Sequence, residues 1–204
     1  MFQHPALVQT HQHIEPNKKI EIYYPMISGL TNHSVQQHIN RSVMDAYHQL
    51  LKERSYYEPS LLELNGWFEV KTNQRGIFSV ALYVYSYTGG AHGMTTIRTL
   101  TFDMTTGKQY TLTDLFKAGS NYQTKLLDII KFQIKQREIP VISEPINFPG
   151  NNNFYIADKS LILFYQLYDL APYYYGITYF PISIYDLQNI IDENGPLGKM
   201  MGSF

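Results

Sequence analysis

The sequence has 204 residues, a formal net charge of -1 from 16 basic and 17 acidic side chains, and a hydrophobic fraction of 44%. This balance predicts one globular unit with a sizeable core, and no global electrostatic field that would draw the chain to nucleic acid or to an anionic membrane. The chain has no cysteine, which excludes disulfides and thiol catalysis, and no segment approaches the roughly 20 apolar residues of a membrane helix.

The first quarter of the chain predicts strands followed by a long helix. Residues 7–14 alternate in polarity, and a turn-rich Glu-Pro-Asn-Lys stretch separates them from a second strand-like run at 18–27, as in a hairpin or a strand crossover. From about residue 32 to 54 the apolar residues recur at helical spacing, with Asn32 or Ser34 available as N-cap. The apolar positions of this helix are Val35, Ile39, Val43, Ala46 and Leu50.

The middle of the chain predicts a meander of four antiparallel strands and then a second helix. The strand-like runs lie at 67–72, 77–87, 95–103 and 109–116, the last running into a short turn, and the run at 77–87 is apolar enough to be central. Ser120 can cap the helix, which ends before Pro140. Its apolar stripe is formed by Leu126, Leu127, Ile130 and Ile134.

The last third returns to β-structure. A hairpin is expected about Asp158-Lys159, another strand at 178–184, and a short closing helix at 185–192. The predicted fold class is therefore α+β, a mainly antiparallel β-sheet with two principal α-helices and a short C-terminal helix. We expect residues 1–204 to form a single compact unit.

The run Gly-Gly-Ala-His-Gly at residues 89–93 stands between two predicted strands. A phosphate-binding loop would need a following helix, and residues 94–102 are strand-like instead. His92 could act as a general base, but we favour a structural loop in which Gly89, Gly90 and Gly93 permit positive φ or close backbone approach, and His92 bonds turn carbonyls.

Histidines and aspartates offer weaker candidates for chemistry. His11 and His13 alternate on one strand face, but no third histidine has partner spacing, so we expect no metal site and no cofactor. Asp103, Asp114, Asp158 and Asp169 could pair as glycosidase carboxylates. Turn or capping roles are the better interpretation for the first three.

An aromatic loop is the strongest candidate for binding. Seven of the 18 tyrosines fall between Tyr165 and Tyr185, and tyrosine combines a large contact area with a hydroxyl group. An exposed cluster would suit a protein or a sugar, whereas alternate tyrosines could instead pack in the core. The candidate binding residues are Tyr168, Pro172, Tyr173, Tyr174 and Tyr175.

Four blocks in series resemble a known family: TGGAHG, TFDMTTGKQYTLTDLF, FYIADKSLILFYQLYDLAPYYYG and FPISIYDL. In order and spacing they are similar to the RsiV/PdaC-like family of extracytoplasmic domains, built from the domains of unknown function 3298 and 4163. Residues 1–85 resemble the 4163-type half, and residues 86–193 resemble the 3298-type half.

The resemblance implies an antiparallel α+β fold, usually outside the membrane of Gram-positive bacteria. In RsiV-like members the module binds lysozyme, whereas the activity of the deacetylase lies in a separate domain that this sequence lacks. The loop around residues 172–175 would correspond to a partner-contacting region. The N-terminus as printed shows no export signal, so a cytoplasmic location stays open.

We therefore expect a non-enzymatic, sensor-like module of a cell-envelope protein, with a lysozyme-like protein or a cell-wall glycan as partner and no nucleic acid. The alternative is a hydrolase that acts on cell-wall material, with His92 as base and an aspartate such as Asp103 as its partner. An enzyme should bring these two side chains together in a pocket, whereas a binder should present its tyrosines.

Overall fold

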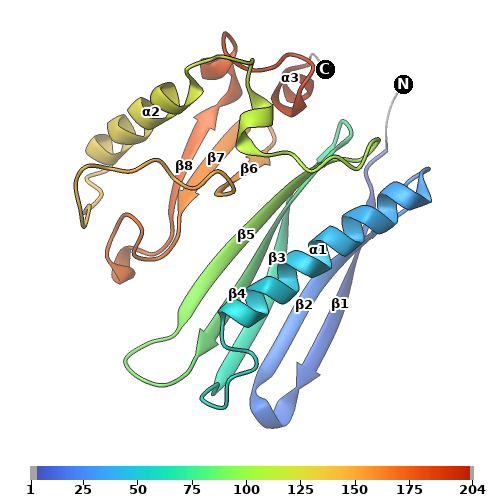
Figure 1. Ribbon diagram of the computed structural model, residues 1–204, viewed down its shortest axis with the longest axis vertical. Helices are drawn as coiled ribbons and strands as arrows, with labels where there is room; N and C mark the ends of the chain where they lie inside the picture. The colour runs from blue at the N-terminus through green and yellow to red at the C-terminus, as the bar shows by residue number, and fades with distance from the viewer. Residues whose placement is uncertain (1–3, 203–204) are drawn as a thin grey trace. The chain divides into compact units, whose positions relative to one another are not determined.

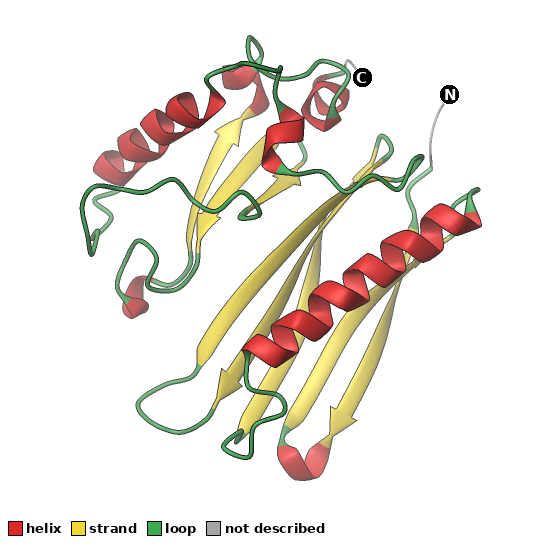
Figure 2. Ribbon diagram, in the orientation of Figure 1, coloured by secondary structure: helices red, strands yellow, loops and turns green. Residues whose placement is uncertain are grey.

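The computed structural model describes residues 4–202, which belong to two compact units, Met1–Gln109 and Tyr110–Phe204 (Figures 1 and 2). Each unit combines helices with a largely antiparallel sheet, so the expected α+β class is confirmed. We expected residues 1–204 to form a single compact unit. That expectation depends on how the two units are joined, and it stays a prediction.

The first unit is a five-stranded sheet with one long helix, α1 (His33–Glu53), lying along one face (Figure 1). The strand order is β1-β2-β3-β4-β5. β2 and β3 are parallel because α1 connects them as a crossover, while the other neighbouring pairs are antiparallel. The strands are β1 (Leu7–Glu15), β2 (Ile20–Ser28), β3 (Glu63–Gln74), β4 (Ile77–Tyr87) and β5 (Met94–Asp103), with a 3-10 turn, η1 (Pro16–Lys18), between the first two.

The helix and the central strand follow the sequence pattern closely. The side chain of Asn32 accepts hydrogen bonds from the backbone N–H groups of Ser34 and Val35, which makes it the N-cap of α1. All five expected apolar positions of α1 are buried, and so are Tyr47 and Leu51. β4 is buried along nearly its whole length between β3 and β5, as expected of a central strand.

The second unit is a three-stranded antiparallel sheet in the order β6-β7-β8, accompanied by α2 (Tyr122–Gln136) and a short α3 (Pro196–Met201). The hairpin about Asp158-Lys159 is confirmed, because β6 and β7 pair across these two residues. Three buried residues of α2 lie in the expected stripe, and Leu127 is half-buried. The remaining elements are β6 (Phe154–Ala157), β7 (Ser160–Tyr165), β8 (Thr178–Ser183), η2 (Leu112–Leu115), η3 (Tyr173–Tyr175) and η4 (Ile184–Leu187).

Three local expectations were wrong. The run at 109–116 is not a fourth strand of the meander, because Thr111 and Asp114 form a capping box that starts the 3-10 turn η2. Asn121, not Ser120, precedes α2 as N-cap. The closing helix at 185–192 is replaced by the short η4, and α3 follows later in the chain.

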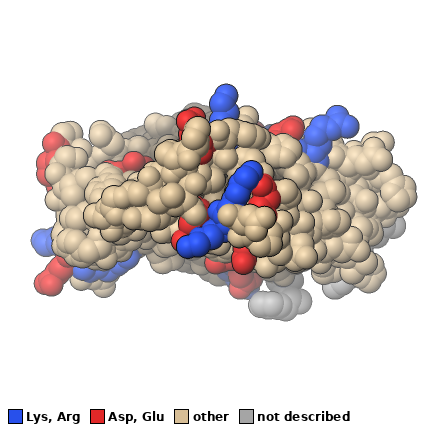
Figure 3. All heavy atoms as spheres, turned by 90° about the horizontal axis from the view of Figure 1, so that it is seen from below, with Lys and Arg blue, Asp and Glu red and all other residues tan. Residues whose placement is uncertain are grey.

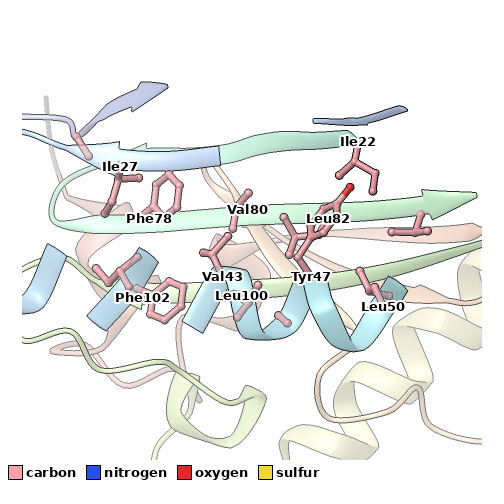
Figure 4. Packing of buried hydrophobic residues seen from close by; sticks show 14 of the residues in the cluster. Ile22, Ile27, Val43, Tyr47, Leu50, Phe78, Val80, Leu82, Leu100 and Phe102 are labelled. Atoms are coloured by element: carbon pink, nitrogen blue, oxygen red, sulfur yellow. The ribbon is translucent and has the colours of Figure 1, made fainter. Parts of the chain in front are cut away.

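The core of the first unit has an unusually close contact between α1 and the sheet. Tyr47 is 1% exposed and reaches from α1 toward the sheet near Ile22 (Figure 4). A Cβ atom added to Gly66 of β3 would lie 1.9 Å from the Tyr47 hydroxyl. That hydroxyl is buried with no hydrogen-bond partner among the described residues, and burial raises the pKa of the Tyr47 phenol. Glycine at position 66 therefore sets how closely the helix approaches β3.

A polar cluster ties the end of β1 to the turn after α1. The carboxylate of Glu15 accepts a hydrogen bond from the Tyr56 hydroxyl (2.7 Å), pairs with Lys18 (2.8 Å) and lies 2.9 Å from Nε2 of His13. Lys18, followed by His13 and Tyr56, lowers the pKa of Glu15 from 4.5 to about 2. The same carboxylate raises the pKa of Tyr56 to about 12. The cluster connects two segments that are distant in sequence.

The contact between Tyr47 and Gly66 predicts opposite effects for two small substitutions. Gly66→Ala should lower the free energy of unfolding by about 1–3 kcal/mol, because the new methyl group overlaps the Tyr47 hydroxyl. Tyr47→Phe should raise it by about 1 kcal/mol, because the change removes a buried hydroxyl that has no partner. Urea unfolding of both single variants and the double variant would measure these values. An equal cost of Gly66→Ala with Tyr or Phe at position 47 would contradict the contact.

The Glu15 cluster predicts a pH-dependent contribution to stability. Because folding lowers the pKa of Glu15, its contribution is fully present above pH 4.5 and is lost as the pH falls toward about 2. Glu15→Gln should therefore be less stable than the parent chain at pH 7, and the difference should shrink below pH 4.5. Urea unfolding from pH 7 to pH 3 would measure it, with Lys18→Gln as a second variant that loses part of the same stabilisation. A stability difference that is the same at every pH would rule out this role of Glu15.

Candidate functional site

The aromatic loop after β7, residues 166–177, is hereafter called the Tyr loop. Local hydrogen bonds hold its backbone: Asp169 accepts from the N–H of Gln166 (3.2 Å), and the N–H of Tyr175 donates to the carbonyl of Pro172 (2.9 Å). Leu170 and Ala171 are buried and anchor the middle of the loop. The loop is thus an ordered turn with buried anchors.

The outer part of the Tyr loop presents aromatic rings to solvent. Tyr174, within the 3-10 turn η3, is 79% exposed, and Tyr168 is 46% exposed. Tyr168 has a positive φ of 67°, a strained conformation for a non-glycine residue. Its ring lies 5.8 Å from that of Tyr173. Pro172, Tyr173 and Tyr175 are half-buried.

Not every tyrosine in this part of the chain is exposed. Tyr165 is buried, its hydroxyl donates to the carbonyl of Asn147 at 2.6 Å, and burial raises its pKa. Tyr179 is half-buried, and Tyr185 is 46% exposed. Buried, half-buried and exposed tyrosines thus occur together in this part of the chain.

The Gly-Gly-Ala-His-Gly segment forms the connection between β4 and β5. Gly89 and Gly90 have φ values of 101° and 96°, which favour glycine. Gly93 is buried, and a Cβ atom there would come within 2.4 Å of the Tyr85 ring. His92 is exposed, and its Nδ1 lies 3.0 Å from the carbonyl oxygen of Gly93. This geometry favours the structural interpretation of the loop.

The structure does not bring His92 and Asp103 together. His92 lies just before β5 and Asp103 is its last residue, so about 30 Å of extended strand separates them at about 3.3 Å per residue. The carboxylate of Asp103 is buried and accepts from the N–H groups of Thr105 and Thr106 at 2.8 and 2.9 Å. Asp103 is thus part of a turn at the far end of the strand from His92.

The other candidate acids also have local structural roles. Asp114 closes the capping box of η2, and Asp158 lies in the β6–β7 turn with a positive φ of 47°. Asp169 holds the first residue of the Tyr loop. The carboxylates of Asp114 and Asp169 thus stabilise a cap and a loop, and Asp158 is a turn residue, which favours the structural interpretation of all three.

The histidines of β1 make aromatic and polar contacts. The ring of His11 stacks on Tyr24 with centroids 5.7 Å apart, and His13 contacts Glu15. Among residues 4–202, no group of three or more His, Cys, Asp or Glu side chains is placed to hold a metal ion.

Sequence reasoning missed a groove on the second unit, which we call the α2 groove. It has a volume of about 1030 Å³ and is lined by residues of α2, β8 and η4. Phe132 of α2 lies in it with 66% of its surface exposed. Gln133 of α2 and its C-cap residue Arg137 donate to the backbone carbonyls of Pro181 (2.8 Å) and Tyr179 (2.7 Å). These carbonyls belong to β8, an edge strand of the sheet, and the two bonds cover part of that edge. The sequence signal that could have indicated this groove is Phe132, a large apolar residue of α2 that lies outside the buried stripe of Ile130 and Ile134.

On the face drawn in Figure 3, charged residues do not mark a site. On the face drawn in Figure 3, basic and acidic side chains are scattered among uncharged residues and are not separated by sign. Within the described part of the chain, no helix has the length and apolar character needed to cross a membrane. The exposed aromatic rings of the Tyr loop are therefore a more specific feature than charge.

Comparison with family models matches two successive parts of the chain. Residues 14–95 match the model described as deacetylase PdaC, and residues 113–185 match the model of a protein of unknown function, DUF3298. The Gly-Gly-Ala-His-Gly loop falls within the first match.

Two Bacillus subtilis proteins are similar in sequence. The chain is 27% identical to anti-sigma-V factor RsiV over 188 residues, which cover 84% of the chain and 65% of RsiV. It is 24% identical to peptidoglycan-N-acetylmuramic acid deacetylase PdaC over 138 residues, which cover 64% of the chain and 30% of PdaC. The chain thus spans just under two thirds of one relative and about a third of the other.

Two solved structures share the fold. A DUF3298-family protein from Bacteroides fragilis superposes with a TM-score of 0.69 at 17% identity, covering 96% of this chain and 95% of the other. A DUF3298-family protein from Pseudomonas aeruginosa gives a TM-score of 0.61 at 16% identity, with coverages of 95% and 96%. With these matches the resemblance to the RsiV/PdaC-like family is confirmed: the chain is similar to the PdaC model over residues 14–95 and to the DUF3298 model over residues 113–185.

Proposed function

We propose that this chain is a non-enzymatic binding module of a cell-envelope protein and that it binds a lysozyme-type protein through the Tyr loop. The observation that carries the proposal is the exposure of Tyr174, 79%, in a turn whose neighbours Leu170 and Ala171 are buried. An exposed ring on an anchored backbone loses little conformational entropy when it binds. Tyrosine is also enriched among the residues that dominate the binding energy of protein interfaces.

The chemistry of the loop suits a protein surface. Asp169 is the one charged residue between positions 166 and 177, and its carboxylate accepts from the backbone of the loop itself. Contacts would therefore come from rings and hydroxyls, the groups that let an interface combine apolar burial with hydrogen bonds. An anti-sigma factor among the relatives supports a role in recognition.

The hydrolase alternative is not proposed. Its motivating pair, His92 and Asp103, lies at opposite ends of β5, so neither side chain can orient the other. The deacetylase relative supports an envelope setting, but the chain matches 30% of that protein. Its activity therefore supplies no role for a residue of this chain.

The proposal predicts saturable binding of the intact chain to a c-type lysozyme in a calorimetric titration. Tyr173→Ala combined with Tyr174→Ala should weaken binding by at least about 2 kcal/mol, or about 30-fold in Kd, the usual threshold for a dominant interface residue. Tyr174→Phe removes only the hydroxyl, so its Kd should separate the contribution of the ring to binding from that of the hydroxyl. The matched control is Tyr57→Ala, which removes a 69% exposed tyrosine from the first unit.

Two results would overturn the proposal. One is the absence of binding by a chain that circular dichroism shows to be folded. The other is a Kd that the double substitution leaves unchanged. Binding of a cell-wall glycan that the double substitution abolishes, without any binding of lysozyme, would keep the loop as the site and contradict a protein partner.

A further inference from the structure

A cavity of about 260 Å³ lies in the first unit between the β1–β2 hairpin and the C-terminal half of α1, and we call it the hairpin pocket. It belongs to a different unit from the Tyr loop, and an inference about it does not rest on the proposed function. Aromatic side chains form most of its wall. They are His13, Tyr24, Tyr47, His48, Tyr56 and Tyr57.

The walls of the pocket are held in place before any ligand binds. Tyr24 stands between the stacked ring of His11 (5.7 Å) and the buried ring of Tyr47 (6.3 Å). On the other side, the hydroxyl of Tyr56 is fixed by Glu15 at 2.7 Å. Such fixed side chains lose little freedom on binding, which is the usual condition for a specific small-molecule site.

The rim adds an exposed ring next to a fixed one. Tyr57 is 69% exposed, and its ring meets that of Tyr56 edge to face at 4.9 Å. His48 of α1 is exposed at the same pocket. The pocket thus offers aromatic faces for stacking together with an imidazole for hydrogen bonds.

The lining has no carboxylate, ammonium or guanidinium group that would select an ion. None of the described residues that line the pocket is Asp, Glu, Lys or Arg. The nearby carboxylate of Glu15 is paired with Lys18 and accepts from Tyr56. A quaternary ammonium ligand would find aromatic rings, but it has no hydrogen-bonding group to offer the exposed imidazole of His48. A neutral ligand with both an apolar face and hydroxyl groups fits better.

We propose that the hairpin pocket binds a single neutral sugar ring, with Tyr57 stacked on its face and His48 bonded to its hydroxyls. The volume of 260 Å³ has room for about nine waters at about 30 Å³ each. This is close to the size of one sugar ring, which has about a dozen heavy atoms. It is too small for an oligosaccharide to be enclosed, so a glycan chain would be bound through one unit. Tyr24 and Tyr47 also line the cavity, and the 1% exposure of Tyr47 places it on the inner side.

The test is a two-dimensional NMR titration of the ¹⁵N-labelled intact chain with glucose and with N-acetylglucosamine. A ligand of about a dozen heavy atoms should bind with a Kd on the order of 1 mM. The largest shift changes should fall on residues 13, 22–24 and 44–57. N-acetylprolinamide, a ring of similar size with peptide chemistry, is the control ligand.

Variants locate the site and separate it from the Tyr loop. Tyr57→Ala should weaken sugar binding at least 10-fold, Tyr57→Trp should retain it, and His48→Ala should weaken it. Tyr174→Ala should leave the sugar Kd unchanged. The proposal is overturned if a folded chain binds neither sugar, if N-acetylprolinamide binds in their place, or if Tyr174→Ala abolishes sugar binding while Tyr57→Ala does not.

Discussion

The close approach of Tyr47 to Gly66 is the constraint on which the first unit depends. Tyr47 extends from the buried stripe of α1 to the place where β2 and β3 run side by side, and only a residue without a side chain leaves room for its hydroxyl. The helix can therefore lie close to the sheet, and its other apolar residues reach the core around β4 (Figure 4). The same ring lines the hairpin pocket. Helix packing and the shape of the pocket are thus set by one contact.

In the second unit the main feature is a loop with a buried anchor and exposed aromatic rings. Exposed tyrosines on a mobile segment would lose much freedom on binding. Buried Leu170 and Ala171, together with backbone hydrogen bonds within the loop, fix the segment that carries Tyr174. We interpret the strained backbone at Tyr168 in the same way, as part of a loop shaped to present its rings.

Much of the fold could be predicted from sequence because its signals are local. The stripe of α1 and the apolar run of β4 are patterns within one element, and burial follows them directly. The run at 109–116 misled because it alternates like a strand, whereas the Thr111–Asp114 capping box makes a turn more favourable. The parallel pairing of β2 with β3 could not be predicted either, since β-strands about 40 residues apart carry no register signal in the sequence.

The candidate sites could be predicted only in part, for the same reason. The Tyr loop is continuous in sequence, so its tyrosines could be named in advance, although which of them are exposed depends on the anchors at 170 and 171. The hairpin pocket combines β1, β2, α1 and the turn after it. Its histidines and tyrosines are as far apart as positions 13 and 57, and no spacing rule connects them. Phe132 of the α2 groove could have been noticed as an apolar residue outside its helix stripe.

The Tyr loop is, in our proposal, the surface that meets a protein partner. Hydroxyl-radical footprinting of the intact chain, alone and saturated with a c-type lysozyme, tests this most directly, because it reads the exposure of each tyrosine. We predict that Tyr168 and Tyr174 are modified in the free chain and protected in the mixture, while the exposed Tyr57 is modified equally in both. Unchanged modification of Tyr168 and Tyr174 in the mixture, or protection of Tyr57 alone, would contradict it.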